Sequence, residues 1–141
     1  VLVGWAAVTG SLGLAPLVLF AVIFVWTPPH FWALAIRYRE DYAAAEVPML
    51  PAVASLATTA RRIVAYTLAL WACSIVFAPV AGMGLLYLGA AVLLGALFLA
   101  QAVQLWLDST AQRAMRLFSY SISYITLLFT AMALDQVIRS R

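Results

Sequence analysis

Charged side chains are scarce in this chain of 141 residues. Only 9% of the residues are charged and 67% are apolar, whereas about a quarter are charged in an ordinary soluble domain. A water-soluble fold of this size could not cover so much apolar surface with so few charges. The composition therefore indicates an integral membrane protein. Lysine is absent, and the eight basic residues are all arginines: Arg37, Arg39, Arg61, Arg62, Arg113, Arg116, Arg139 and Arg141.

Other absences exclude further classes. The single cysteine, Cys73, lies inside an apolar run, so an internal disulfide is excluded. The arginines form no basic face with interleaved aromatic residues, so nucleic acid is not an expected partner. The chain begins Val-Leu-Val-Gly-Trp, without a methionine or a basic segment. We therefore expect no signal peptide here and interpret the chain as part of something longer.

The apolar runs are long enough to cross a bilayer, which takes about 20 helical residues. They predict an all-α, multi-pass transmembrane helical bundle with about four spans, near 14–36, 63–77, 85–107 and 117–138. The second span is short unless it extends back through Thr58, which would let Arg61 and Arg62 reach the interface. Asp108-Ser109-Thr110 is expected to cap the last helix, and residues 1–8 look like the end of a preceding span.

One segment is unusual for a membrane helix. From Trp26 the chain reads WTPPHFWALAIRYREDYAAAEVPMLP. The prolines at 28 and 29 predict a broken helix, with Thr27 capping a half-helix that begins at Pro28. His30 lies well inside the apolar stretch, where an ionisable group is a functional candidate by default. The alternative is a packing histidine bonded to a neighbouring helix.

Helical periodicity would place four of these residues on one face: Trp26, His30, Arg37 and Asp41. At ~1.5 Å per residue, His30 would lie ~10 Å below Arg37 and ~16 Å below Asp41. Such a face suits a ligand with an anionic head and a large apolar or aromatic body. The alternative is a solvated helix end in which Arg37 pairs with Asp41. The aromatic residues of the segment could likewise be an interfacial belt.

The stretches TPPHFWALAIRYREDY (27–42) and VPMLP (47–51) resemble the second signature region of the protoheme IX farnesyltransferases, which are UbiA-type intramembrane prenyltransferases. The resemblance implies the last four spans of a nine-helix fold. It also implies that residues 1–141 are one transmembrane prenyltransferase domain, incomplete at its N-terminal side. Family members transfer farnesyl from farnesyl diphosphate to a vinyl group of protoheme IX, making heme O and releasing diphosphate. The expected cofactor is Mg²⁺, held with the diphosphate, and heme b is a substrate.

The resemblance also implies roles for residues. Asp41, Arg37 and His30 are the catalytic candidates. Asp41 and Glu40 would bind the metal, Arg37 and Arg39 would contact phosphate oxygens, and His30 would lie near the porphyrin. The heme or prenyl pocket would contain Trp26, His30, Phe31, Trp32, Tyr38 and Tyr42.

The chain departs from the family pattern in two ways. Many members have glycine where this chain has Glu46, so the turn after Tyr42 is expected to differ. The family's first acidic motif is absent, so the chain would carry half a site and would be inactive without the missing N-terminal half.

Two other classes compete with an enzyme. A transporter can also build its substrate site from a broken helix with a midplane polar residue, but it usually has a matching interruption in a second half. No such interruption is found in this sequence. A purely structural subunit would leave the charged cluster around Arg37 and Asp41 unexplained.

The arginines predict topology. Six of them flank the 37–62 and 108–116 connections, which places these connections in the cytoplasm and residues 79–84 outside, in a plasma-membrane protein. Single-cysteine variants Ala44→Cys and Met83→Cys, with Cys73 replaced, test this. An impermeant thiol reagent should label position 83 in intact cells and position 44 only after permeabilisation. Labelling of position 44 in intact cells would reverse the orientation.

Overall fold

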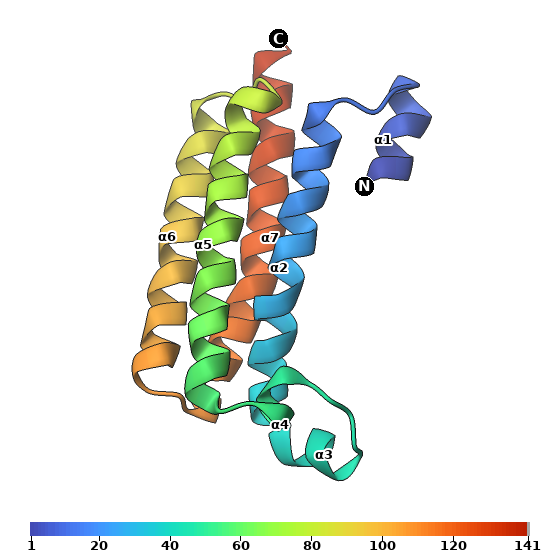
Figure 1. Ribbon diagram of the computed structural model, residues 1–141. Helices are drawn as coiled ribbons and strands as arrows, with labels where there is room; N and C mark the ends of the chain where they lie inside the picture. Colours follow the sequence, from blue (N-terminus) through green and yellow to red (C-terminus); the bar gives the residue numbers. More distant parts are fainter. Residues whose placement is uncertain (141) are drawn as a thin grey trace.

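The computed structural model describes residues 1–140, and every regular element in this range is a helix (Figure 1). Four helices are long and apolar enough to cross a membrane. The predicted all-α, multi-pass bundle is therefore confirmed. The helices are α1 (Leu2–Thr9), α2 (Leu14–Arg37), α3 (Arg39–Ala44), α4 (Leu50–Val53), α5 (Leu56–Val80), α6 (Leu85–Leu107) and α7 (Ala111–Arg139).

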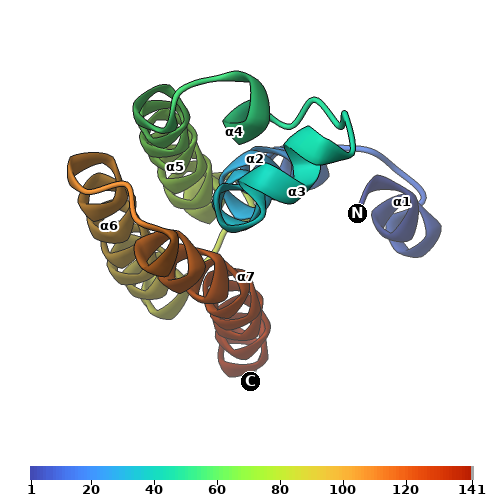
Figure 2. The same ribbon diagram turned by 90° about the horizontal axis from the view of Figure 1, so that it is seen from below.

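The four long helices form a bundle in which each packs against two others. Helix α2 lies against α5 and α7, and α6 lies against the same two helices from the other side (Figure 2). Small residues at the contacts let the backbones approach closely. A Cβ added at Gly95 of α6, for example, would overlap the ring of Trp71 in α5. The fully buried alanines of the core are Ala33, Ala35, Ala60, Ala91, Ala102 and Ala114.

The observed bounds agree with two predicted spans and extend the other two. Helix α6 covers 85–107 as predicted, and α2 ends one residue later than expected. Helix α5 begins at Leu56 because Ser55 caps it, accepting a hydrogen bond from the backbone nitrogen of Thr58 (3.1 Å). Helix α7 begins at Ala111 because Thr110 caps it, as the sequence predicts. Of the two C-terminal arginines, Arg139 ends α7, and Arg141 lies outside the described residues.

The predicted break at the proline pair is wrong. Helix α2 continues through Pro28 and Pro29. The Thr27 hydroxyl does not cap a new helix but donates to the carbonyl of Ile23 (2.9 Å), one turn back. This bond does not replace the two that the prolines cannot make, which would end at the carbonyls of Phe24 and Val25. Membrane helices tolerate such a loss where neighbouring helices pack against them. The transporter alternative depended on a broken helix, so this finding removes its basis.

The break occurs instead at Tyr38, whose φ of −105° and ψ of 27° end α2. Helix α3 then lies across the end of α2 rather than extending it (Figure 2). The predicted single face therefore holds for Trp26, His30 and Arg37 but not for Asp41. The pairing of Arg37 with Asp41, which the alternative of a solvated helix end included, is also not found. Within residues 1–140 the one ion pair joins Arg113 to Asp108.

A carboxylate closes the opposite end of the bundle. Asp135 of α7 is 3% exposed. It accepts hydrogen bonds from the backbone nitrogens of Gly84 (2.6 Å) and Tyr87 (3.3 Å), at the start of α6. Arg139 donates to the carbonyl of Gly82 in the same turn. A Cβ at Gly84 would lie 2.7 Å from the Asp135 carboxylate, so a larger residue here would force that carboxylate to shift. Asp135 thus serves as the N-terminal cap of another helix.

This contact predicts the consequence of two substitutions. Asp135→Leu leaves two backbone N–H groups without an acceptor, so the free energy of unfolding should fall by about 1–3 kcal/mol per lost partner. Asp135→Asn keeps one acceptor oxygen in nearly the same volume and should lose less. Thermal unfolding in detergent measures both. Equal stability of Asp135→Leu and the unmodified protein would show that the cap is not stabilising.

Candidate functional site

A cavity of about 410 Å³ opens where α2 meets α3. Its walls come from segments far apart in the sequence: the end of α2, the first turn of α3, the start of α5 and the connection between α6 and α7. The bundle therefore gathers the predicted charged residues around one space. The lining residues are Ile36, Arg37, Tyr38, Arg39, Glu40, Asp41, Leu56, Ser109 and Ala111.

The charges around this cavity are available to a ligand. Arg37, Arg39, Glu40 and Asp41 are all exposed, and none forms an ion pair within residues 1–140. Glu40 and Asp41 lie in the first turn of α3, where the helix favours negative charge. Two guanidinium groups beside two carboxylates can bind a polyanion directly and through a cation. We therefore treat this cavity as the polar half of the candidate site.

The carboxylate pair fits a magnesium–phosphate site in part. Carboxylate oxygens are suitable donors for Mg²⁺, which is commonly held by one or two carboxylates together with phosphates and water. Within residues 1–140, no group of three or more His, Cys, Asp or Glu side chains is placed to hold a metal. Glu40 and Asp41 would therefore supply part of a coordination shell that needs further ligands.

His30 lies deeper, between two aromatic rings. Its ring stacks on Trp26 of the same helix, with centroids 4.4 Å apart, and on Phe118 of α7 at 4.6 Å. The two interplanar angles are 21° and 24°, so the three rings form one stack. Because α2 is continuous from His30 to Arg37, the helical rise places His30 ~10 Å below the polar cavity.

Ser121 of α7 fixes the orientation of this stack. The His30 Nδ1 atom lies 2.7 Å from the Ser121 hydroxyl, and the Trp26 indole N–H donates to the Ser121 carbonyl (2.9 Å). The Ser121 hydroxyl donates its one proton to the carbonyl of Phe118 (2.6 Å). It must then accept from His30, which places the proton on Nδ1 and leaves Nε2 with a lone pair. His30 is thus bonded to a neighbouring helix, as the packing alternative requires, but keeps one nitrogen for a ligand.

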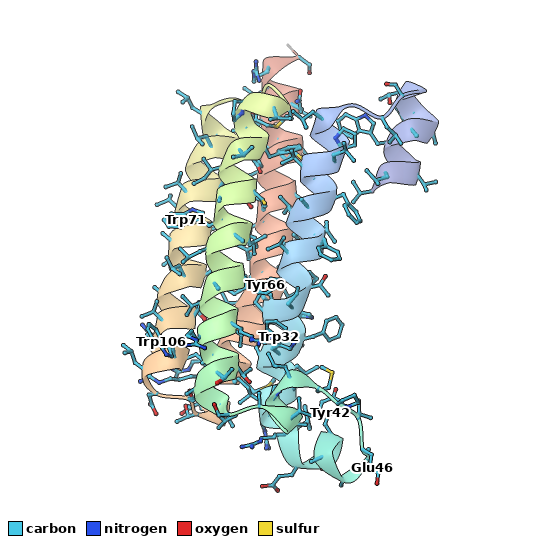
Figure 3. All side chains as sticks on the ribbon, in the orientation of Figure 1. Trp32, Tyr42, Glu46, Tyr66, Trp71 and Trp106 are labelled. Carbon is cyan, nitrogen blue, oxygen red and sulfur yellow. The ribbon has the colours of Figure 1, made fainter. Side chains whose placement is uncertain are left out.

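The predicted pocket aromatics do not form one group. Phe31 meets the His30 ring edge-on at 5.2 Å, so it belongs to the stack. Trp32 points to α5 instead and contacts the ring of Tyr66 at 5.2 Å, as the two labelled side chains in Figure 3 show. Tyr38 lines the polar cavity. Tyr42 lies on α3 (Figure 3) and is not among the residues that line this cavity. Side chains alternate around α2, and this rotation separates neighbours such as Phe31 and Trp32.

The difference expected in the turn after Tyr42 is not found at Glu46. Glu46 has a φ of +54°, in the left-handed region that favours glycine, and the turn is closed by a hydrogen bond from the Val47 nitrogen to the Tyr42 carbonyl (3.0 Å). The turn therefore keeps a geometry that suits glycine although the side chain is larger. Figure 3 shows Glu46 at the outer edge of this connection.

Sequence reasoning missed the contributions of α7. Phe118 and Ser121 complete the His30 stack, and Ser109 lines the polar cavity. One signal was present, because hydroxyls at 119, 121 and 123 interrupt an apolar span. Nothing in a single sequence says which of these hydroxyls faces α2.

Comparison with known proteins gives one family. Residues 1–132 match the model of the UbiA prenyltransferase family. Proteins named protoheme IX farnesyltransferase are similar to the chain: one from Parafrankia sp. is 56% identical over 94% of this chain and 44% of its own length. The relative from Frankia alni is 52% identical over 98% of this chain and 49% of its own length. The chain thus spans less than half the length of these curated relatives. No solved structure matches.

The hydrogen-bond network predicts the tautomer of His30, which is the one histidine of the chain. Nitrogen-15 spectra of histidine-labelled protein in detergent should show a protonated Nδ1 and a bare Nε2. Ser121→Ala removes the acceptor and should shift the ring toward the Nε2–H form. Ser123→Ala, two residues along on another face of α7, is the matched control and should change nothing. An Nε2–H ring in the unmodified protein would contradict this assignment.

Proposed function

The chain belongs to the UbiA prenyltransferase family, and on that premise we propose that the protein containing it is a protoheme IX farnesyltransferase. It would transfer the farnesyl group of farnesyl diphosphate to a vinyl group of protoheme IX, making heme O for a cytochrome oxidase cofactor. The similarity to proteins named protoheme IX farnesyltransferase supports this assignment. The reaction would take place at the cytoplasmic side of the plasma membrane, which is the side that the arginine distribution predicts for the polar cavity.

The observation that carries the proposal is the arrangement along α2. A cavity with two arginines and two carboxylates lies at its end. An aromatic stack around His30 lies ~10 Å deeper on the same helix. A prenyl diphosphate has a strongly anionic head and an apolar tail, and a porphyrin has a broad aromatic face. This one helix therefore offers a surface for each part of the two substrates.

Farnesyl transfer requires a charged surface for the diphosphate and an apolar surface for the prenyl group. The bond between the farnesyl C1 carbon and the diphosphate oxygen breaks, and the oxygen keeps the electron pair. Arg37 and Arg39 would stabilise the charge that develops on the diphosphate. Mg²⁺, held in part by Asp41 and Glu40, would neutralise diphosphate charge. The vinyl carbon then bonds to C1, water adds to the adjacent carbon, and a proton is released to solvent.

The stack would serve the apolar step. Aromatic faces stabilise an allylic cation, and a site without stray water prevents its early capture. Trp26 and Phe31 are the aromatic residues next to His30. The lone pair on His30 Nε2 would contact the heme, and Ser121 would hold the ring in position. In this role Ser121 is a positioning residue.

The chain would supply half of the site. We propose that the remaining metal ligands and the rest of the apolar cavity come from the part of the protein outside residues 1–141. Two carboxylates opposite two arginines do not make a site of high negative charge, so the chain alone should show no farnesyl transfer.

Substitutions in the complete protein test the polar half. Asp41→Asn removes a negative oxygen from an exposed position without changing volume, so it should fold normally and lose at least about 100-fold in turnover, in the range of a lost charge-stabilising group. Arg37→Ala should mainly raise the KM for farnesyl diphosphate. Arg62→Ala, an exposed arginine of the same membrane side, is the control. Heme O formation is the measurement.

Near-normal heme O formation by Asp41→Asn would show that the acidic pair is only a solvated helix end. Equal effects of Arg37→Ala and Arg62→Ala would point to general surface charge rather than a diphosphate contact.

A further inference from the structure

A second polar cavity, of about 730 Å³, lies between α6 and α7. It sits beside the last turns of α6 and the first turns of α7. The candidate site includes Ser109 of the α6–α7 connection and Ala111, the first residue of α7. The second cavity is lined on α7 only from Gln112 onward and includes no residue of α2 or α3. It is therefore separate from the candidate site. Its lining residues are Gln101, Gln104, Gln112, Arg113, Met115, Arg116, Ser119, Tyr120 and Ser123.

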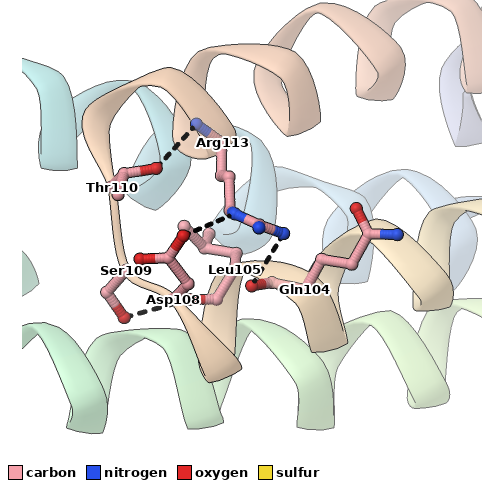
Figure 4. Close-up of polar contacts among 6 residues, drawn as sticks. All are labelled: Gln104, Leu105, Asp108, Ser109, Thr110 and Arg113. Carbon is pink, nitrogen blue, oxygen red and sulfur yellow. Dashed lines mark hydrogen bonds and ion pairs between the residues drawn. The ribbon is translucent and has the colours of Figure 1, made fainter.

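Hydrogen bonds and an ion pair hold Arg113 of this cavity in place, and a second arginine is left without a counter-charge among the described residues. Arg113 pairs with Asp108 through Nε (2.9 Å) and also reaches the Gln104 carbonyl (3.5 Å), as Figure 4 shows. Thr110 accepts from the Arg113 backbone nitrogen (Figure 4). Arg116 forms no ion pair within residues 1–140. The cavity thus has one uncompensated cation and several amide and hydroxyl donors.

An apolar hollow of about 350 Å³ continues along the same two helices. On α6 the exposed Leu93 and Leu97 precede Gln101 at helical spacing, so all three lie on one face. Tyr120 connects the two hollows, because it lines the polar cavity and donates to the carbonyl of Leu94, which lines the apolar one (2.9 Å). The apolar hollow is lined by Leu86, Ala90, Leu93, Leu94, Leu127, Thr130, Ala131 and Leu134.

We propose that this groove binds an anionic phospholipid, with its phosphate at Arg116 and an acyl chain along the leucines toward Leu93. Basic hollows between membrane helices at the arginine-rich side are suited to such headgroups. From Gln104 to Leu93 the helical rise is ~16 Å, close to the ~15 Å of one leaflet's hydrocarbon. One uncompensated cation matches the single charge of a phosphodiester. A metal-bound diphosphate would need carboxylates, and the one carboxylate here, Asp108, is already paired with Arg113.

Lipid titration of the complete protein tests this proposal. Native mass spectrometry of the detergent-solubilised protein would measure the affinity of the first bound phosphatidylglycerol, with phosphatidylcholine of the same chains as the neutral probe. Arg116→Gln should weaken phosphatidylglycerol binding by about fivefold, the contribution of one basic residue. Ser119→Trp, which fills the cavity without changing charge, should also weaken it. Arg62→Gln, which removes an exposed arginine of α5 outside the groove, is the matched control and should leave binding unchanged.

The competitors distinguish the possible sources of the anion. If neither inorganic phosphate nor farnesyl diphosphate displaces the bound phosphatidylglycerol, the result supports a lipid site. Displacement by inorganic phosphate would overturn the proposal in favour of a soluble-anion site, and displacement by farnesyl diphosphate in favour of a prenyl-substrate groove. Equal affinities in Arg116→Gln and Arg62→Gln, or equal binding of the two phospholipids, would also overturn it.

Discussion

The hydrogen bond between His30 and Ser121 is the contact on which the site depends. It joins residues 91 positions apart and, with the bond from the Trp26 indole to the Ser121 carbonyl, ties α2 to α7. The membrane interior offers no water, so a histidine at this depth needs a protein partner. Once that partner is Ser121, the rotation of α2 about its own axis is fixed. The face that carries Arg37 to the polar cavity is fixed by the same contact.

The continuity of α2 turns this local contact into a two-part site. A helix broken at Pro28 would let the His30 stack and the Arg37 end move independently. The Thr27 hydroxyl instead bonds to Ile23, and the helix runs on to Tyr38. The charged side chains therefore lie at the membrane surface, where water hydrates them, and the aromatic side chains lie in the apolar layer. This division matches a substrate whose leaving group is ionic and whose transferred group is a hydrocarbon.

Local sequence features predicted much of the fold and less of the site. Apolar runs located α2 and α6 to within a residue, because hydropathy and span length are local properties. The apolar run alone begins at Ile63, but α5 extends back past Thr58 to Leu56, with Arg61 and Arg62 exposed on a helix that Ser55 caps. The proline pair predicts a break in α2 that does not occur, and nothing in the sequence predicts the break at Tyr38. Ser121 and Asp135 act on residues 91 and 51 positions away, and a single sequence does not show such pairings.

A photoactivatable farnesyl diphosphate analogue tests the central claim that one face of α2 presents both halves of the site. The complete protein would be irradiated with the analogue, which carries its reactive group at the far end of the prenyl chain, and the labelled residues would be identified by peptide mass spectrometry. We expect labelling on the His30 side of α2, at Trp26 or Phe31, that is lost when inorganic diphosphate competes. Labelling of Trp32 and Tyr66, on the face that packs against α5, would contradict it.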